Sequence, residues 1–139
     1  KDTSRYYFGG GSQDAPAPGD YDGDGTADAV IFREGTGLWA VKGITRFYFG
    51  RRGDRPLAAV FTGSPAHIPA IFRPATGLWA VYGSTRFYFG AAGDRPLPAN
   101  YDGDGTADRA VFRPSSGLWA LGGVSRIYFG RWADIPVSR

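Results

Sequence analysis

Two nine-residue stretches of this chain gather acidic side chains at short spacing. Residues 20–28 read DYDGDGTAD, and residues 100–108 read NYDGDGTAD. Carboxylates this close repel one another unless a cation lies among them. Calcium is the cation that takes about six to eight oxygen ligands from carboxylates, carbonyls and water. The sequence therefore predicts two calcium sites, with side-chain ligands from Asp20, Asp22, Asp24 and Asp28 and from Asn100, Asp102, Asp104 and Asp108.

The same spacing separates these loops from an EF-hand. An EF-hand loop has a bidentate glutamate at its twelfth position, where this chain has Ile31 and Val111. At the corresponding place in the middle of the chain, residues 60–68 read VFTGSPAHI, and every acidic ligand is lost. We therefore expect calcium at the two acidic loops and none at the middle loop, with a structural rather than a signalling role.

The loops belong to a repeat with a period of 40 residues. The phrase GLWA begins at Gly37, Gly77 and Gly117, and the phrase RFYFG or RIYFG begins at Arg46, Arg86 and Arg126. A related phrase, RYYFG, occupies residues 5–9. Internal repeats of this length indicate a repeat architecture rather than an ordinary globular domain. We interpret residues 1–139 as a single repeat array.

Within one repeat the apolar residues recur with a period of two. Short aromatic and β-branched runs separated by Gly, Pro and Ser predict strands at 107–113, 117–121 and 125–130, preceded by a shorter strand at 95–101. Four strands in forty residues are typical of a propeller blade. The predicted fold class is all-β, with three four-stranded antiparallel blades at about 15–50, 55–90 and 95–130.

The residues from Leu97 to Pro114, LPANYDGDGTADRAVFRP, resemble the FG-GAP/VCBS-type repeat of bacterial secreted proteins and integrin α-chain propellers. The resemblance covers essentially the whole chain. It implies that the acidic loop joins the first two strands of a blade and binds calcium through the eight side chains named above. It also implies that Thr26 and Thr106 offer backbone carbonyls to the ion.

Three blades do not easily close a ring, because propellers usually have about four to eight. Residues 1–14 would supply a lone last strand and residues 131–139 a lone first strand. Such pieces could be completed when chains meet, so the sequence predicts self-association into a closed ring or an open polymer. The alternative is that the chain is a fragment of a longer propeller.

Trp39, Trp79 and Trp119 occupy the same place in each repeat. A large aromatic side chain at a repeated position suits packing between neighbouring blades. The alternative is a platform on which sugars stack, as in a lectin with one site per blade. The two interpretations differ in the expected exposure of these three rings.

Charged residues also recur with the repeat. Arginines at 33, 73 and 113 and at 46, 86 and 126, with aspartates at 54, 94 and 134, predict ion pairs between blades; binding of an acidic ligand is the alternative. Arg52-Gly53-Asp54 spells the tripeptide that integrins recognise, but we interpret it as a chance match. His67, the only histidine, is expected to be an ordinary loop residue.

Composition limits the function classes. With one histidine, no cysteine and one glutamate, no catalytic set can be assembled, so we predict that the protein is not an enzyme. A net charge of +3 without a basic run argues against a nucleic-acid partner. No apolar run has the length of a membrane helix. The need of such loops for abundant calcium favours a secreted or cell-surface location for a processed chain, with the protein itself and glycans as the candidate partners.

Overall fold

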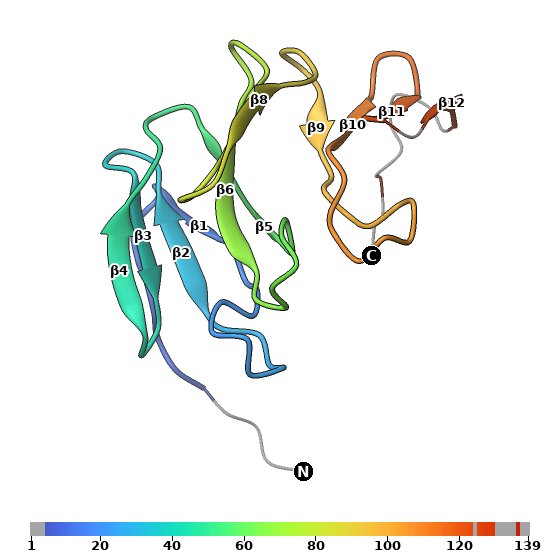
Figure 1. Cartoon of the computed structure of the whole chain (residues 1–139). Helices are drawn as coiled ribbons and strands as arrows, with labels where there is room; N and C mark the ends of the chain where they lie inside the picture. The colour runs from blue at the N-terminus through green and yellow to red at the C-terminus, as the bar shows by residue number, and fades with distance from the viewer. Residues whose placement is uncertain (1–4, 124, 130–135, 137–139) are drawn as a thin grey trace.

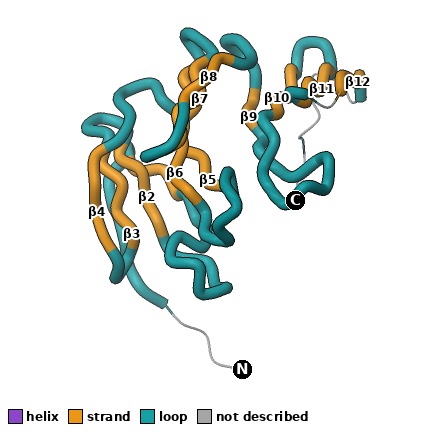
Figure 2. Tube along the Cα trace, in the orientation of Figure 1, coloured by secondary structure: helices purple, strands orange, loops and turns teal. Residues whose placement is uncertain are grey.

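The computed structural model describes residues 5–123, 125–129 and 136, and the described residues contain strands and no helix (Figure 2). The strands form three four-stranded antiparallel sheets, each built from consecutive strands in chain order. The first sheet contains β1 (Asp14–Pro16), β2 (Val30–Arg33), β3 (Leu38–Val41) and β4 (Thr45–Tyr48). The second contains β5 (Arg55–Ala59), β6 (Ile68–Arg73), β7 (Leu78–Val81) and β8 (Arg86–Tyr88). The third contains β9 (Arg95–Pro96), β10 (Ala110–Arg113), β11 (Leu118–Leu121) and β12 (Ser125–Tyr128).

The three sheets follow one another in chain order across the molecule (Figure 1). The expectation of an all-β chain with three four-stranded antiparallel units is confirmed, whereas a closed ring is not part of the described structure. The predicted last-strand piece at residues 5–9 is in no strand. In each sheet the fourth strand pairs with the third, and no described strand lies beside residues 5–9 to take that place. The predicted first-strand piece at 131–139 lies outside the described residues except for Pro136.

The core lies between the sheets rather than within any one of them. One buried cluster joins Phe32 and Trp39 of the first sheet to Ile71 and Ala80 of the second. A second cluster joins the second sheet to the third. The central strands are therefore buried on both faces, which explains why β2 and β3 read as nearly continuous apolar runs. In the outer strand β4 only Phe47 is partly buried, and the other three residues are exposed.

The first hairpin of each sheet carries the loop of interest, and the three hairpins differ in how far their ladder extends. In the second sheet β5 pairs with β6 without interruption from Arg55 to Ala59. In the first and third sheets the ladder stops early and resumes as an isolated bridge, Gly19 with Asp28 and Ala99 with Asp108. Pro18 and Pro98 lie between the end of the strand and the bridge, and proline cannot donate a ladder hydrogen bond. The acidic loops thus hang from short, interrupted hairpins.

Candidate metal centre

The first acidic loop connects β1 to β2 and is closed at its base by the main chain. The N–H of Asp28 donates to the carbonyl of Gly19 at 2.7 Å. The Tyr21 hydroxyl donates to the Ala17 carbonyl at 2.7 Å, which fixes the loop against the preceding strand. The N–H of Tyr21 donates to the carboxylate of Asp28 at 2.8 Å. Hydrogen bonds within the protein therefore hold both ends of the loop without a metal ion.

Three carboxylates converge in this loop. Oxygen atoms of Asp20, Asp22 and Asp28 all lie within 4.8 Å of one another. No other group of three His, Cys, Asp or Glu side chains comes this close elsewhere in residues 5–123, 125–129 and 136. Three of the four acidic ligands expected from the sequence are thus brought together at one point.

The loop's own N–H groups orient the first carboxylate. Asp20 accepts hydrogen bonds from the N–H of Gly23 at 2.7 Å, of Asp24 at 3.1 Å and of Gly25 at 2.8 Å. Gly23 and Gly25 have φ angles of 79° and 91°, a left-handed conformation that other residues adopt only with strain. The glycines therefore allow the chain to wrap around Asp20.

Asp24 is not among the three clustered carboxylates and bonds Thr26 instead. Its carboxylate accepts from the Thr26 N–H at 2.8 Å and from the Thr26 hydroxyl at 2.7 Å. The hydroxyl bond first, and the N–H bond second, lower the pKa of the Asp24 carboxyl. Metal ligation by Asp24 and by the Thr26 carbonyl stays a prediction.

The clustered charges also affect protonation. The pKa of the Asp22 carboxyl is raised above its ordinary value. The hydrogen bond from the Asp24 N–H lowers it, but desolvation and the negative charges of Asp24 and Asp28 raise it by more in sum. Burial, followed by the charge of Asp28, raises the pKa of Tyr21. A bound cation would relieve this repulsion, since it favours the charged form of each carboxylate.

The second acidic loop, between β9 and β10, has a similar frame with one charge fewer. Asn100 accepts from the N–H of Gly103 at 2.8 Å, the place that Asp20 fills in the first loop. Asp108 accepts from the N–H groups of Tyr101 at 2.8 Å and Asp102 at 3.2 Å. Because Asn100 stands in place of Asp20, the second loop lacks the carboxylate that completes the cluster of Asp20, Asp22 and Asp28 in the first loop.

Asp104 repeats the behaviour of Asp24. Its carboxylate accepts from the N–H and the hydroxyl of Thr106, each at 2.8 Å. These two bonds, the N–H bond first, lower the pKa of the Asp104 carboxyl. Ligation of a metal by Asp104 and by the Thr106 carbonyl stays a prediction.

The middle loop, residues 60–68, connects β5 to β6, the corresponding hairpin of the second sheet, without carboxylates. The N–H of Ser64 donates to the Thr62 hydroxyl at 3.3 Å, and the N–H of Ala66 donates to the Ser64 hydroxyl at 3.4 Å. Its third and fifth positions therefore accept from the main chain as Asp22 and Asp24 do, though with longer contacts. None of its residues has a left-handed φ angle. The hairpin can thus close without acidic side chains and without left-handed glycines.

The donor set fits a hard cation of calcium's kind. All of its side-chain atoms are oxygens, the charge is concentrated, and the loop is exposed so that water can complete the coordination. The fit rests on the convergence of Asp20, Asp22 and Asp28, which is not required to form the turn. When bound, calcium would supply charge neutralisation and a cross-link between the start of the loop and its end.

The tryptophans expected to stack on sugars or to pack between units are mostly covered. Trp39 and Trp79 are fully buried, and each donates its indole N–H to a main-chain carbonyl, of Phe49 at 2.9 Å and of Phe89 at 2.8 Å. Trp119 makes the equivalent bond to Phe129 at 3.0 Å but is only half-buried. The burial of Trp39 and Trp79 favours the packing interpretation over a sugar platform.

The arginine–aspartate pairs form, but not where the sequence predicted them. Arg73 binds Asp54 and Arg113 binds Asp94 through two hydrogen bonds each. These pairs join the first two strands of one sheet, so the prediction of pairs between sheets is wrong for them. The reason is register, because the first-strand aspartate lies opposite the second-strand arginine, as in the neighbouring pair Asp14 and Arg33.

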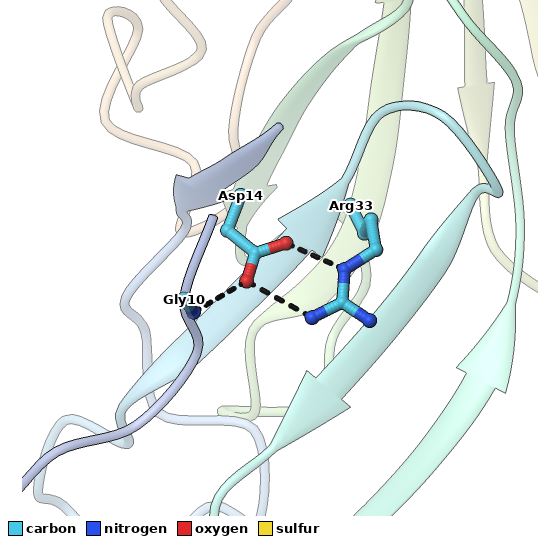
Figure 3. A network of polar contacts seen from close by, with 3 residues as sticks. All are labelled: Gly10, Asp14 and Arg33. Carbon is cyan, nitrogen blue, oxygen red and sulfur yellow. Dashed lines mark hydrogen bonds and ion pairs between the residues drawn. The ribbon is translucent and has the colours of Figure 1, made fainter. Parts of the chain in front are cut away.

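Asp14 and Arg33 form the matching pair in the first sheet. Two hydrogen bonds of 2.7 and 3.1 Å join them, and Asp14 also accepts from the N–H of Gly10 at 2.7 Å (Figure 3). The bonds from Arg33 hold the pKa of Asp14 below its ordinary value. Asp134 lies outside the described residues, and Arg46, Arg86 and Arg126 take part in no ion pair within the described part of the chain.

Two sequence interpretations of loop residues have different outcomes. Asp54 is buried and bonded to Arg73 and to the N–H of Arg51, so its carboxylate is not available to an integrin-type receptor. His67, expected to be an ordinary loop residue, reaches across to the first sheet. Its N–H donates to the Asp20 carbonyl at 2.6 Å, and its Nδ1 accepts from the Asp20 N–H at 3.2 Å. Nothing in the sequence indicated this contact.

Comparisons with protein-family models, with curated proteins and with solved structures gave no match to this chain. In the part of the chain described here, no helix is long and apolar enough to span a membrane. The chemistry of the acidic loops and the faces of the sheets are therefore the basis for a functional conclusion.

Proposed function

We propose that this chain is a non-enzymatic, calcium-binding protein of the FG-GAP/VCBS-type propeller-repeat class, in which each four-stranded sheet serves as one blade. The observation that carries the calcium assignment is the convergence of Asp20, Asp22 and Asp28 within 4.8 Å. The middle loop closes the corresponding hairpin of the second sheet without carboxylates, so the acidic residues are not required to form the turn. Holding them together without a cation would be unfavourable.

The role of the ion in this proposal is structural. It would tie the beginning of the loop, at Asp20, to its end, at Asp28 just before β2, in a hairpin whose ladder is interrupted. Ligand binding to the folded state alone stabilises that state by mass action. Because such loops require abundant calcium, the proposal places the protein outside the cell or at its surface.

The proposal also gives the protein a self-assembling role, as the subunit of a ring, tube or filament. It is supported by the exposed aromatic and aliphatic side chains at the end of the array. On β12 and directly after it, Ile127 and Phe129 are 48% and 74% exposed, whereas the equivalent phenylalanines of the other two sheets are partly buried. Apolar groups of this size gathered on one edge are typical of a surface that another protein covers.

The lectin alternative has less support. A sugar platform on each unit requires exposed rings, whereas Trp39 and Trp79 have 0% exposure. Only Trp119 presents part of its ring, and the other units contain no equivalent exposed site among the described residues. A glycan array with hits abolished by Trp119→Ala would reverse this preference.

The experiment that tests the proposal is sedimentation velocity and thermal unfolding of the purified chain, with calcium and with a chelator. We expect species larger than the 14.9 kDa chain and a melting temperature about 5–10 °C higher in excess calcium. An unchanged melting temperature would contradict the metal assignment, and a monomer at all concentrations would contradict self-assembly.

A further inference from the structure

The junction between the first and second sheets shows how one unit of this chain covers the next. We call the side formed by the third-strand tryptophan and the inward residues of the fourth strand the trailing face of a sheet. On the first sheet it consists of Trp39, Phe47 and Phe49. Trp39 is buried against Ile71, and the rings of Phe47 and Phe49 lie 4.6 and 5.2 Å from that of Tyr82.

The junction between the second and third sheets repeats this arrangement. Trp79 is buried with Val111, Leu118 and Ala120 of the third sheet. The guanidinium of Arg109 lies over the rings of Phe87 at 5.2 Å and Phe89 at 5.7 Å, where the first junction has Tyr82. The side of a sheet that receives a trailing face, headed by Ile31, Ile71 or Val111, is called its leading face.

A main-chain hydrogen bond sets the register of each junction. At the first, the His67 N–H donates to the Asp20 carbonyl at 2.6 Å. At the second, the Ala107 N–H donates to the Val60 carbonyl at 2.7 Å. The donor equivalent to His67 and Ala107 in the first repeat is the Ala27 N–H. The acceptor equivalent to Asp20 and Val60 in the third repeat is the Asn100 carbonyl. Within the described residues neither of these two groups makes a hydrogen bond.

Among the residues that the structure describes, no sheet covers the trailing face of the third sheet. It consists of Trp119, Ile127 and Phe129. Trp119 is half-buried where Trp39 and Trp79 are buried, and Ile127 and Phe129 are 48% and 74% exposed. This face carries the same kinds of side chain as the two trailing faces that are already covered.

The leading face of the first sheet is covered by a short segment of its own chain. Residues 5–9, RYYFG, repeat the fourth-strand phrase, and Gly9 lies against Ile31 as Gly50 lies against Ile71. A Cβ atom added at these two glycines would come within 3.0 and 3.1 Å of the isoleucine side chains. The Gly10 N–H donates to Asp14 as the Arg51 N–H donates to Asp54.

Residues 5–9 are held only loosely. They make no strand ladder, and Tyr7 is fully exposed. Tyr6 and Phe8 line an open groove of about 390 Å³ that also includes Ala27 and Ile31. The side chain of Lys42 lies 4.6 Å from the Tyr6 ring, the place that Tyr82 takes over Phe47. The segment therefore imitates a fourth strand without the sheet that would hold it.

We propose that the trailing face of the third sheet docks on the leading face of the first sheet in a second copy of this chain, and that residues 5–9 cover that leading face until docking displaces them. This inference rests on the self-assembly proposed above and names its two surfaces. In the docked state the Ala27 N–H of one copy bonds the Asn100 carbonyl of the other, which extends the register seen at both internal junctions. Head-to-tail docking of this kind gives a ring if the rotation closes and a filament if it does not.

The alternative exchange, in which residues 5–9 replace β12 on the partner's third sheet, is less favourable. β12 has four ladder pairs with β11, from Leu118 with Tyr128 to Leu121 with Ser125. Residues 5–9 have none, so removing them from the leading face breaks no strand ladder. Residues 5–9, and not β12, are therefore the segment that is displaced on docking.

The test compares double variants of the full chain by sedimentation equilibrium in calcium. Ile127→Ser with Phe129→Ser removes apolar groups from the trailing face, and we expect association at least about a hundredfold weaker. Tyr128→Ser is the matched control, because successive side chains of a strand point to opposite faces. Tyr6→Ser with Phe8→Ser weakens the cover, so association should become several-fold tighter. Circular dichroism and thermal unfolding establish that each variant is folded.

Each outcome has one consequence. If the wild-type chain associates and Ile127→Ser with Phe129→Ser has no more effect than Tyr128→Ser, the docking surface is wrong while self-assembly stands. If Tyr6→Ser with Phe8→Ser weakens association, residues 5–9 are a donated strand and not a cover. If neither the wild-type chain nor the Tyr6→Ser, Phe8→Ser variant associates, both the inference and the self-assembly proposal fail. A wild-type chain that associates, and that associates more tightly after the cover is weakened, supports the inference.

Discussion

The first loop and the middle loop occupy the same place in successive sheets and solve the same problem differently. The first gathers three carboxylates and turns with left-handed Gly23 and Gly25. The middle loop has Thr62 and Ser64 at the corresponding acidic positions and needs no left-handed residue. It also follows an unbroken ladder in place of an interrupted one. The difference teaches that strand pairing can hold the hairpin where the metal ligands are absent.

The largest effect is expected when the first loop is replaced by the sequence of the middle loop. A chain in which VFTGSPAHI replaces residues 20–28 should bind one calcium ion fewer, because all four acidic side chains leave. In excess calcium the melting temperature should fall by about 5–10 °C, the stabilisation that a bound ligand at about a hundredfold its Kd provides. Calorimetric titration measures the stoichiometry. An unchanged stoichiometry would place the calcium elsewhere.

The reverse exchange tests whether the acidic residues are sufficient. Replacing residues 60–68 by DYDGDGTAD introduces the carboxylates. It also puts a glycine in place of Pro65, at the position of the left-handed Gly25, where proline cannot adopt the required φ angle. We expect a third calcium ion per chain and a chelator-sensitive melting temperature. The gain should be smaller than the loss in the first exchange, because the β5–β6 ladder already holds this hairpin. Restoring Pro65 alone is the control and should abolish the added site.

The two acidic loops differ by one charge, which offers a finer test. Asn100→Asp gives the second acidic loop the same four acidic positions as the first, and we expect its calcium affinity to rise roughly tenfold. The gain reflects attraction between one additional negative charge and a divalent ion at a distance of a few ångströms. Asp20→Asn is the matched control and should lower the affinity of the first loop by a similar factor. Equal affinities before and after the change would show that this position does not contact the ion.

The smallest effect should change sign with calcium. Because the pKa of Asp22 is raised, its contribution to folding is fully present below its unfolded pKa and is lost as the pH rises through the folded value. At pH 7 without calcium, Asp22→Asn should therefore raise the melting temperature slightly, whereas with calcium it should lower it. Thermal scans with and without chelator at pH 4 and pH 7 measure both. Thr62→Asn in the middle loop should give no such reversal.

Much of the fold could be predicted because the sequence states the same pattern three times. Four apolar runs per repeat were sufficient to indicate four-stranded antiparallel sheets. The ion pairs could be predicted as pairs but not placed, because sequence shows that Asp54 and Arg73 recur and does not show their strand register. The convergence of Asp20, Asp22 and Asp28 follows from their spacing, whereas the different orientation of Asp24 depends on its two bonds to Thr26.

What sequence could not indicate depends on position in the array. Trp79 and Trp119 have the same neighbours in sequence, yet one is buried and the other half-buried, because within the described residues a sheet is stacked only on Trp79. His67 had no partner in its own loop, and its contact with Asp20 arises only when two sheets stack. Residues 5–9 have the phrase of a strand but lack the neighbouring strand with which to pair.

The pair of hydrogen bonds between Asp20 and His67 has a mechanical consequence. It makes the first acidic loop a point through which force passes from one sheet to the next. Tension that separates the two sheets pulls directly on the main chain of a proposed calcium ligand, so a filled loop should resist with a higher rupture force. Single-molecule pulling in calcium and in chelator measures this force. Equal values would mean that the load bypasses the loop.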